Sequence, residues 1–161
     1  LLDVGGDLDE VARLLAQQEV PYAERVARLR SLSRMGVYSI GGELLLTITC
    51  VGAYESSSLR HAIDAGSDIA LAVAPRDREV RITIRASGRA LRETGIPVAA
   101  ELARYLGASL GGEGGGHEGA AGAVVPYTSI GKLEGSVLEF FSRRGYKVRI
   151  LDRGRWLEEC G

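Results

Sequence analysis

Apolar residues recur at helical spacing over residues 7–34, and this periodicity predicts two helices. Leu8, Val11 and Leu15 would share one face of the first helix. Val20-Pro21 then interrupts the pattern, and proline suits the first turn of a second helix because its missing N–H is not needed there. From residue 37 onward the period shortens to two, which is typical of β-strands. We expect strands at 37–40, 43–51, 69–73, 79–86, 121–125 and 146–151, and helices at 56–65, 96–107 and 132–143.

This order of elements predicts an α/β fold, with a mixed sheet of about five strands flanked by helices and preceded by a helical linker. We assign residues 1–35 to the linker and residues 36–161 to one domain, which ends in a C-terminal helix and a short tail. A chain of 161 residues is long enough for one domain with its own core. No internal repeat is visible in the sequence.

The composition excludes several classes of protein. Hydrophobic residues make up 45% and charged residues 25% of the chain, which is typical of soluble globular proteins. No apolar run approaches the roughly 20 residues of a membrane span, and no signal segment opens the chain, so we expect a cytoplasmic protein with no membrane partner. The net charge of −1 gives no overall basic field that would indicate nucleic acid.

Metal ligands and catalytic groups are sparse in this sequence. The chain has 2 histidines, and neither lies in a cluster of acidic residues at metal-ligand spacing. Cys50 and Cys160 do not have metal-type spacing, and neither a disulfide nor a zinc site follows from them. We therefore expect no metal and no cofactor in this chain, and a capacity to hold a phosphate rather than to cleave one.

The predicted strand at 79–86 carries one apolar and one polar face. Arg81, Thr83 and Arg85 alternate with apolar residues, and Ser87 and Arg89 extend the polar side. A solvated outer face of the sheet explains this pattern. An arginine-lined surface for phosphate explains it equally well, because the guanidinium group matches phosphate oxygens with two parallel hydrogen bonds. The strand alone does not decide between them.

The segment at 111–122 is unusually rich in glycine, which occupies seven of its twelve residues. We expect it to be neither helix nor regular strand, because glycine there costs entropy and adds no packing. Its backbone N–H groups could surround an anion, with His117 as the one side chain able to add charge or a proton. A flexible linker is the alternative. A P-loop is excluded because no lysine follows, and a dinucleotide fold is excluded because a helix precedes the glycines and a strand follows them.

Both segments together resemble the type 1 DHH-associated C-terminal domain of the DHH phosphoesterases, the superfamily of RecJ-like exonucleases and nano-RNA phosphodiesterases. Gly114–Gly122, which reads GGGHEGAAG, is similar to the family's GGGH-x-x-AAG loop. Ile84-Arg85-Ala86-Ser87 is similar to its strand ending in Arg-Ser, with one alanine inserted. The resemblance covers roughly residues 36–126, and the helices before it resemble the family's interdomain linker.

The resemblance implies a substrate-binding domain for nucleic acid or nucleotide phosphate. His117 and Arg85 would contact the phosphate, the backbone of Gly114, Gly115 and Gly116 would donate hydrogen bonds, and Ser87 would be a further contact. Mn²⁺ is implied for the full-length enzyme, where an N-terminal DHH domain outside this chain would hold the metals. The implied partners are that domain and a short single-stranded nucleic acid or a phosphorylated nucleotide, and a homodimer is compatible with the resemblance.

Two alternatives to the phosphoesterase stay open. The C-terminal domain of alanyl-tRNA synthetases, which binds tRNA and dimerises, also has a glycine-rich loop but usually lacks the histidine, so His117 favours the phosphoesterase. A stand-alone interaction module would use the glycines as a structural turn and the arginine face as a protein-binding surface.

Overall fold

The computed structural model describes residues 7–16 and 18–161 of the chain, which form seven strands in one sheet together with helices. The strands are β1 (Gly36–Ile40), β2 (Leu44–Cys50), β3 (Ile69–Pro75), β4 (Glu79–Ala86), β5 (Glu113–Gly116), β6 (Ala120–Pro126) and β7 (Val148–Asp152). The helices are α1 (Leu8–Ala16), α2 (Tyr22–Arg34), α3 (Glu55–Asp64), α4 (Gly88–Thr94), α5 (Val98–Ser109), the 3₁₀ helix η1 (Tyr127–Lys132), α6 (Leu133–Ser142) and α7 (Trp156–Cys160).

The sheet has the strand order β5-β6-β4-β3-β2-β1-β7. β2 and β3 are parallel and are joined through α3, whereas every other neighbouring pair is antiparallel. The predicted mixed α/β architecture is therefore confirmed, but the sheet has seven strands rather than about five. β5 and β7 form its two edges.

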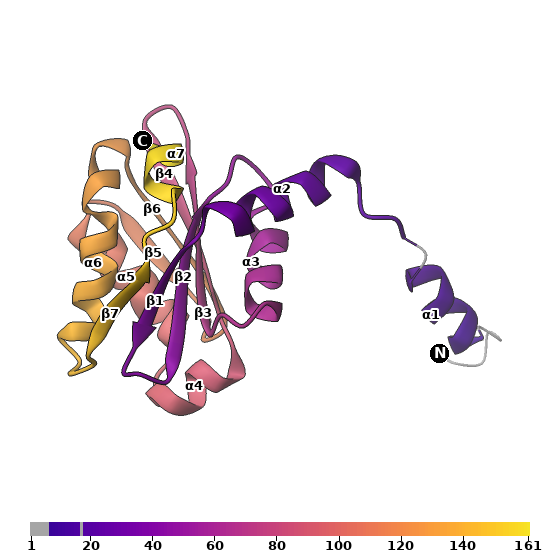
Figure 1. Cartoon of the computed structure of the whole chain (residues 1–161), viewed down its shortest axis with the longest axis horizontal. Helices are drawn as coiled ribbons and strands as arrows, with labels where there is room; N and C mark the ends of the chain where they lie inside the picture. The colour runs from indigo at the N-terminus through magenta and orange to yellow at the C-terminus, as the bar shows by residue number, and fades with distance from the viewer. Residues whose placement is uncertain (1–6, 17) are drawn as a thin grey trace.

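Helices cover the two faces of the sheet unequally (Figure 1). α5 and α6 lie against one face, which we call the packed face. There, side chains such as Leu71, Ile82, Leu102 and Phe140 are completely shielded from solvent. α3, supported by α2, lies against the other face over β3 and its neighbours, where it packs on Ala70, Ala72 and Ala74. We call this second side the open face, because the part of it formed by β4, β6 and β5 stays half-buried or exposed.

The glycine-rich segment contains a strand, which corrects the expectation that it is irregular. β5 pairs with β6 along its whole length and packs closely against α5. A Cβ on Gly107 of α5 would come within 2.5 Å of the backbone of β5, and one on Gly114 would overlap the carbonyl oxygen of Ala103. Glycine is needed here because helix and strand backbones touch, and that close packing offsets its entropic cost.

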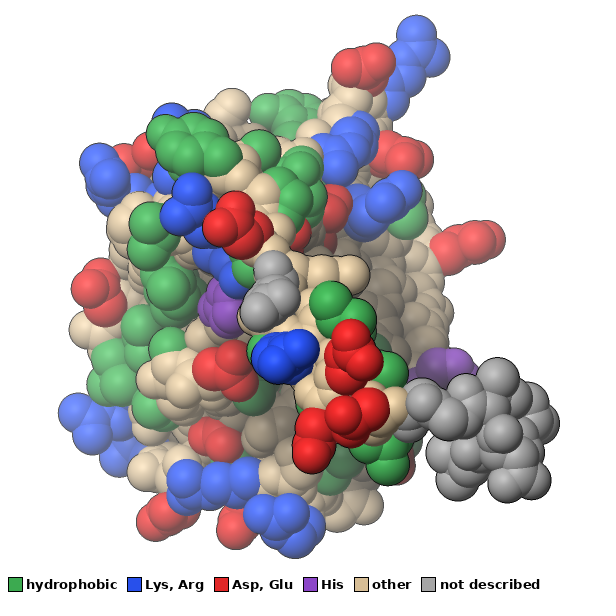
Figure 2. Space-filling model, turned by 90° about the vertical axis from the view of Figure 1, so that its right-hand side faces the viewer, with side chains coloured by type: hydrophobic (Ala, Val, Ile, Leu, Met, Phe, Trp, Pro, Cys, Tyr) green, Lys and Arg blue, Asp and Glu red, His purple; other side chains and the backbone are tan. Residues whose placement is uncertain are grey.

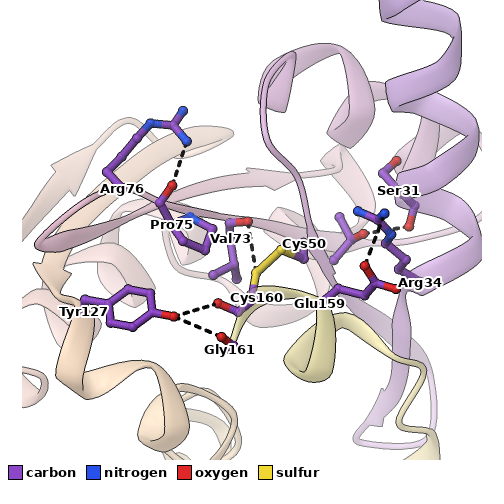
Figure 3. Close-up of a disulfide and its surroundings, with 11 residues drawn as sticks. Ser31, Arg34, Cys50, Val73, Pro75, Arg76, Tyr127, Glu159, Cys160 and Gly161 are labelled. Carbon is purple, nitrogen blue, oxygen red and sulfur yellow. Dashed lines mark hydrogen bonds and ion pairs between the residues drawn. A yellow bond between two sulfur atoms is a disulfide. The ribbon is translucent and has the colours of Figure 1, made fainter.

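The C-terminal segment also differs from the expected short tail. Trp156 of α7 is 1% exposed, and its indole N–H donates to the hydroxyl of Tyr38 on β1 at 3.1 Å. That hydroxyl in turn donates to Glu134 of α6 at 2.7 Å. Cys160 forms a disulfide with Cys50 at the end of β2 (Figure 3). The last helix is thus part of the core.

Burial raises the pKa of the Tyr38 phenol, and the hydrogen bond to the Glu134 carboxylate raises it further. The hydroxyl therefore stays protonated and remains a donor within the core.

The two helices predicted over residues 7–34 are present, and they differ in their contacts. α2 contacts α3 through Arg28, whose guanidinium donates to Ser57 at 2.7 Å. α1 has no buried residue, and Leu8, Val11, Leu14 and Leu15 are between 47% and 72% exposed. Figure 1 shows α1 projecting away from the rest of the chain. Residues 1–6 of the expected linker lie outside the described residues. Among the residues that are described, no helix is long and apolar enough to span a bilayer.

Candidate phosphate-binding site

The open face carries a strip of bare backbone across its last three strands. Thr83 of β4 lies opposite Gly122 of β6, and Gly122 lies opposite Gly115 of β5. The flanking residues Ile82 and Ile84 are buried on the packed face, so Thr83 projects from the open face. Gly122 and Gly115 are the next two residues in this row, so the row has no side chain on β6 or on β5.

The next row on this face brings two sequence-predicted residues together. Arg85 of β4 lies opposite Ala120 of β6, and the N–H of His117 donates to the carbonyl oxygen of Ala120 at 2.8 Å. Arg85 and His117 therefore stand two strand spacings apart, about 10 Å between their Cα atoms. The side chains of both are long enough to reach a group lying over the small side chain of Ala120.

The side chains of Arg85 and His117 are without partners in the described part of the chain. Among the described residues, the Arg85 guanidinium and the His117 imidazole have no hydrogen bond and no ion pair. Arg85 is half-buried, and His117 is exposed at the end of the β5–β6 hairpin. Several other arginines are held by carboxylates, for example Arg89 by Glu43 at 3.3 Å. Arg85 thus keeps its donors available for an external acceptor.

The glycines of the hairpin divide into two groups by the space around them. A Cβ on Gly114 or Gly116 would collide with neighbouring backbone, and Gly116 also has a positive φ of 147°. Both are therefore required by the fold. A Cβ on Gly115 would meet nothing within 4 Å, so packing within the chain does not explain a glycine at this position. Close approach of an external group to the backbone does explain it.

The pairing pattern also assigns the backbone donors of the three glycines. Antiparallel strands alternate hydrogen-bonded and non-hydrogen-bonded residue pairs. Because His117 bonds to Ala120, the next bonded pair is Gly115 with Gly122, and the N–H of Gly115 is used within the sheet. The N–H groups of Gly114 and Gly116 point instead towards the free edge of β5. Gly114 lies against α5, which leaves Gly116 as the accessible donor.

Ser87 has a structural role in this fold. Its hydroxyl oxygen accepts from the N–H of Ala90 at 3.1 Å and caps α4, a helix that the sequence did not predict. The same hydroxyl lies 3.4 Å from a carboxylate oxygen of Asp68. Its donor and its acceptor are thus both engaged inside the chain. The capping position explains why a serine stands immediately before α4.

The residues of these two rows are half-buried or exposed. A pocket of about 240 Å³ lies elsewhere, between α2 and the loop from β2 to α3, and neither Arg85 nor His117 lines it. Within the described residues there is no group of three or more His, Cys, Asp or Glu side chains that could hold a metal ion. The residues present therefore do not fit a manganese site.

Sequence reasoning missed the contribution of Gly122 and Ala120. Each provides a small position between the residues that it had singled out on β4 and in the hairpin. The period of two along the segment at 120–126 was the available signal, because it puts Ala120, Gly122 and Val124 on one face.

Comparisons with known proteins show that this chain shares its fold with solved structures of low sequence identity. No protein-family model matches the chain, and no curated protein matches it significantly. Among solved structures, the C-Ala domain of Aquifex aeolicus alanyl-tRNA synthetase has a TM-score of 0.50 at 18% identity, over 66% of this chain and 95% of that one. PggH, a pGpG-specific phosphodiesterase from Vibrio cholerae, has a TM-score of 0.51 at 13% identity, over 86% of this chain and 47% of that one.

A third neighbour is the DHH domain of PF0399, a member of the S1p family of ribosomal proteins. It has a TM-score of 0.50 at 16% identity, over 85% of this chain and 32% of that one. The chain thus spans about half of PggH and about a third of the PF0399 structure. One of these neighbours is a DHH domain, and the three likenesses show a shared fold.

Proposed function

We propose that this chain is the substrate-binding domain of a DHH-family, manganese-dependent phosphoesterase of the RecJ-like and nano-RNA phosphodiesterase group, with the type 1 form of the DHH-associated domain. It holds a phosphate of a short single-stranded nucleic acid or of a phosphorylated nucleotide. One observation carries the proposal: Arg85 and His117 stand in one row beside the bare backbone of Gly122 and Gly115, and neither side chain has a hydrogen bond or ion pair within residues 7–16 and 18–161.

Each residue has a distinct part in binding. The Arg85 guanidinium donates two parallel hydrogen bonds to phosphate oxygens. His117 donates from its imidazole, and more strongly when it is protonated. The N–H of Gly116 is available at the sheet edge, and Gly115 lets the phosphate approach the backbone closely. Gly114 supports the hairpin through its packing, and Ser87 stays outside the proposed set because its hydroxyl is already engaged.

Catalysis belongs to another part of the enzyme in this proposal. Manganese in a separate DHH domain would supply the activated water, and this chain would present the phosphate to it. The residues described here bind and orient the substrate, and they shield it on one side. The half-buried and exposed residues of this surface fit a site that a second domain completes.

The test measures binding of pGpG and of a short oligothymidylate by the full chain, with fluorescence anisotropy as the readout. His117→Ala and Arg85→Ala should each weaken binding about tenfold or more, because each removes a hydrogen bond to a charged group. Arg81→Ala is the matched control. It lies on the same strand and the same face, about 14 Å from Arg85, and should bind like the parent.

Two further measurements make the result decisive. Arg85→Lys keeps the charge but loses the two-pronged donor, so it should recover only part of the affinity. Thermal unfolding of each variant shows whether the fold is intact. If folded His117→Ala and Arg85→Ala proteins bind both probes as the parent does, the proposal is wrong.

The C-Ala neighbour favours a second candidate, a tRNA-binding and dimerising domain, because the aligned region covers 95% of that domain. This function predicts stronger binding of folded tRNA than of pGpG, together with a homodimer in light scattering. A stand-alone interaction module would bind neither ligand. His117, the likeness to a pGpG-specific phosphodiesterase and the likeness to a DHH domain support the phosphoesterase as the first candidate.

A further inference from the structure

The C-terminal part of the chain is strongly basic, although the net charge of the whole is −1. Residues 142–155 contain Asp152 as the one acidic residue, together with Arg143, Arg144, Lys147, Arg149, Arg153 and Arg155. A concentration of one sign in an otherwise balanced chain is a candidate electrostatic contact for a polyanion.

Some of these cations are already engaged by the fold. Arg143 pairs with Glu139 at 2.7 Å, and Arg153 pairs with Glu134 at 2.8 Å. The Arg144 guanidinium lies over the ring of Phe140, 3.6 Å from its centroid. Lys147 and Arg149 are exposed and have no ion pair or side-chain hydrogen bond in the described part of the chain. Lys147 precedes β7 and lies between Tyr146 and Val148, which both pack against the core, so it projects from the same face as Arg149.

That face is the open face, the one that carries Arg85. Arg149 lies opposite Ser39 on β1, between Val148 and Ile150, whose partners Ile40 and Tyr38 are buried on the packed face. Arg149 therefore projects from the opposite side of the sheet. Figure 2 looks onto this side and shows Lys and Arg side chains along its lower left margin, with acidic side chains between them.

A continuous row of backbone contacts joins Arg149 to the phosphate site. Ser39 lies opposite Leu45, and the N–H of Asp68 donates to the carbonyl oxygen of Leu45 at 2.8 Å. The N–H of Ser87 donates to the carbonyl oxygen of Asp68 at 2.8 Å. From Ser87 the next step is the β5–β6 hairpin, because the N–H of Ala86 donates to Gly119 at 3.0 Å.

Two of the carboxylates along this end of the sheet are engaged by groups of the chain itself. The Asp68 carboxylate is buried and is held by the N–H of Leu45 at 2.9 Å. Glu43 is paired with Arg89. The Arg92 guanidinium lies over the start of α4, where a Cβ on Gly88 would come within 3.3 Å of it. Arg92 thus adds a positive charge beside Gly88, the residue after Ser87.

We propose that Lys147 and Arg149 form a second phosphate contact for a single-stranded nucleic acid whose chain also occupies Arg85 and His117. The inference rests on the proposed function and narrows it to a polymeric substrate. Six strand spacings separate β5 from β7, about 29 Å, which a mononucleotide or a dinucleotide does not bridge. A flexible single strand follows a line of separated cations, and its affinity grows with its length.

The experiment measures binding of oligothymidylates of about two and about eight nucleotides by the full chain over a range of salt concentrations. Lys147→Ala/Arg149→Ala should weaken binding of the longer strand about tenfold and leave that of the shorter one unchanged. The slope of log K against log salt should fall by about 1.4, which is two contacts at about 0.7 each for a single strand.

Arg78→Ala/Lys132→Ala is the matched control, because it removes the same charge near the other end of β4. It should bind both lengths as the parent does. Equal binding of the longer strand by parent and Lys147→Ala/Arg149→Ala proteins would overturn the inference, and so would an equal loss in the control. In either case, loss of binding by His117→Ala would still uphold the proposed function. If His117→Ala binds both lengths like the parent, the proposed function fails first.

Discussion

The two faces of the sheet are built from the same strands but differ in their neighbours. On the packed face, large side chains such as Leu71 and Ile82 meet α5 and α6 without contact with solvent. On the open face, Ala70 and Ala72 admit α3, whereas Thr83 and Arg85 on the neighbouring strand β4 stay half-buried. Burial against the helices explains why the packed face carries large apolar residues. The open face has residues that burial does not explain, and these are the ones to test for function.

Removing the disulfide should have the largest effect, and it tests how much the stability of the packed core depends on the cross-link to α7. Cys50 and Cys160 both belong to the packed core, and their sequence separation is 110. Cys160→Ser should lower the free energy of unfolding by about 4 to 5 kcal/mol, because a cross-link over a long loop restricts the unfolded chain. Guanidinium denaturation with and without a reducing agent measures the effect.

Two controls complete this measurement. Cys50→Ser should lose the same amount, and the reducing agent should bring the parent to the level of the variants. The phosphate site lies on the other face, so pGpG binding by folded variants should be unaffected. A midpoint shift equivalent to less than about 0.5 kcal/mol would mean that the cross-link does not stabilise the fold.

Substitutions at the adjacent residues Gly114 and Gly115 compare the two faces, and their expected effect on stability is the next largest. Gly114→Ala should destabilise the protein by about 3 kcal/mol or prevent folding, because its Cβ would overlap the backbone of Ala103. Gly115→Ala should be neutral or stabilise by up to about 1 kcal/mol, since the new methyl group meets open space. Thermal unfolding compares the two variants.

The same pair also tests the site. Gly115→Ala should weaken phosphate binding in a protein that is fully folded, because the methyl group occupies the surface that the ligand approaches. If Gly115→Ala bound pGpG with the affinity of the parent, the bare backbone strip would have no part in recognition. If Gly115→Ala destabilised the fold as much as Gly114→Ala, the distinction between the faces would not hold at this strand.

The smallest expected effect concerns the helices that support the open face. Glu24 of α2 accepts hydrogen bonds from Ser57 at 2.6 Å and from Arg28 at 2.7 Å, and these lower its pKa below its ordinary value of 4.5. A carboxyl group whose pKa is lower in the folded state stabilises the protein fully above the unfolded value. The contribution is lost as the pH falls through the lower, folded pKa.

Glu24→Gln should therefore be less stable than the parent near neutral pH, and the difference should shrink as the pH falls below about 4.5. Urea denaturation over a pH series measures it. Glu93→Gln, on the exposed surface of α4, controls for loss of one negative charge. A difference that is independent of pH would assign the effect to packing and not to the charged group.

Much of the architecture could be predicted because period and burial coincide. The alternation in β4 correctly indicated one apolar and one polar face, and it put Arg85 on the polar one. β5 was missed because the prediction considered only the entropic cost of glycine in a strand. It did not include the close contact with α5, which requires glycine at these positions. That contact joins Gly107 to Glu113 and Ala103 to Gly114, and neither an alternation nor a helical period in the sequence reports it.

Ser87 and the cysteines show the same limit at single residues. A serine after a strand suits a phosphate contact and a helix cap equally well, and only the presence of α4 decides for the cap. Cys50 and Cys160 are brought together by β2 and α7, and α7 itself was not predicted. Arg85 and His117 were identified from residue type and resemblance, but their common row follows from the strand order together with the register of β4, β6 and β5.

The cross-link between Cys50 and Cys160 has a consequence for limited proteolysis. Cys160 is the second-last residue, so a single cut at any peptide bond between Val51 and Glu159 divides the chain into two pieces that stay covalently joined. On a non-reducing gel the nicked protein should run close to the intact chain, and a reducing gel should separate the fragments. A cut between α1 and α2 lies outside this loop, and it should release the N-terminal segment under either condition.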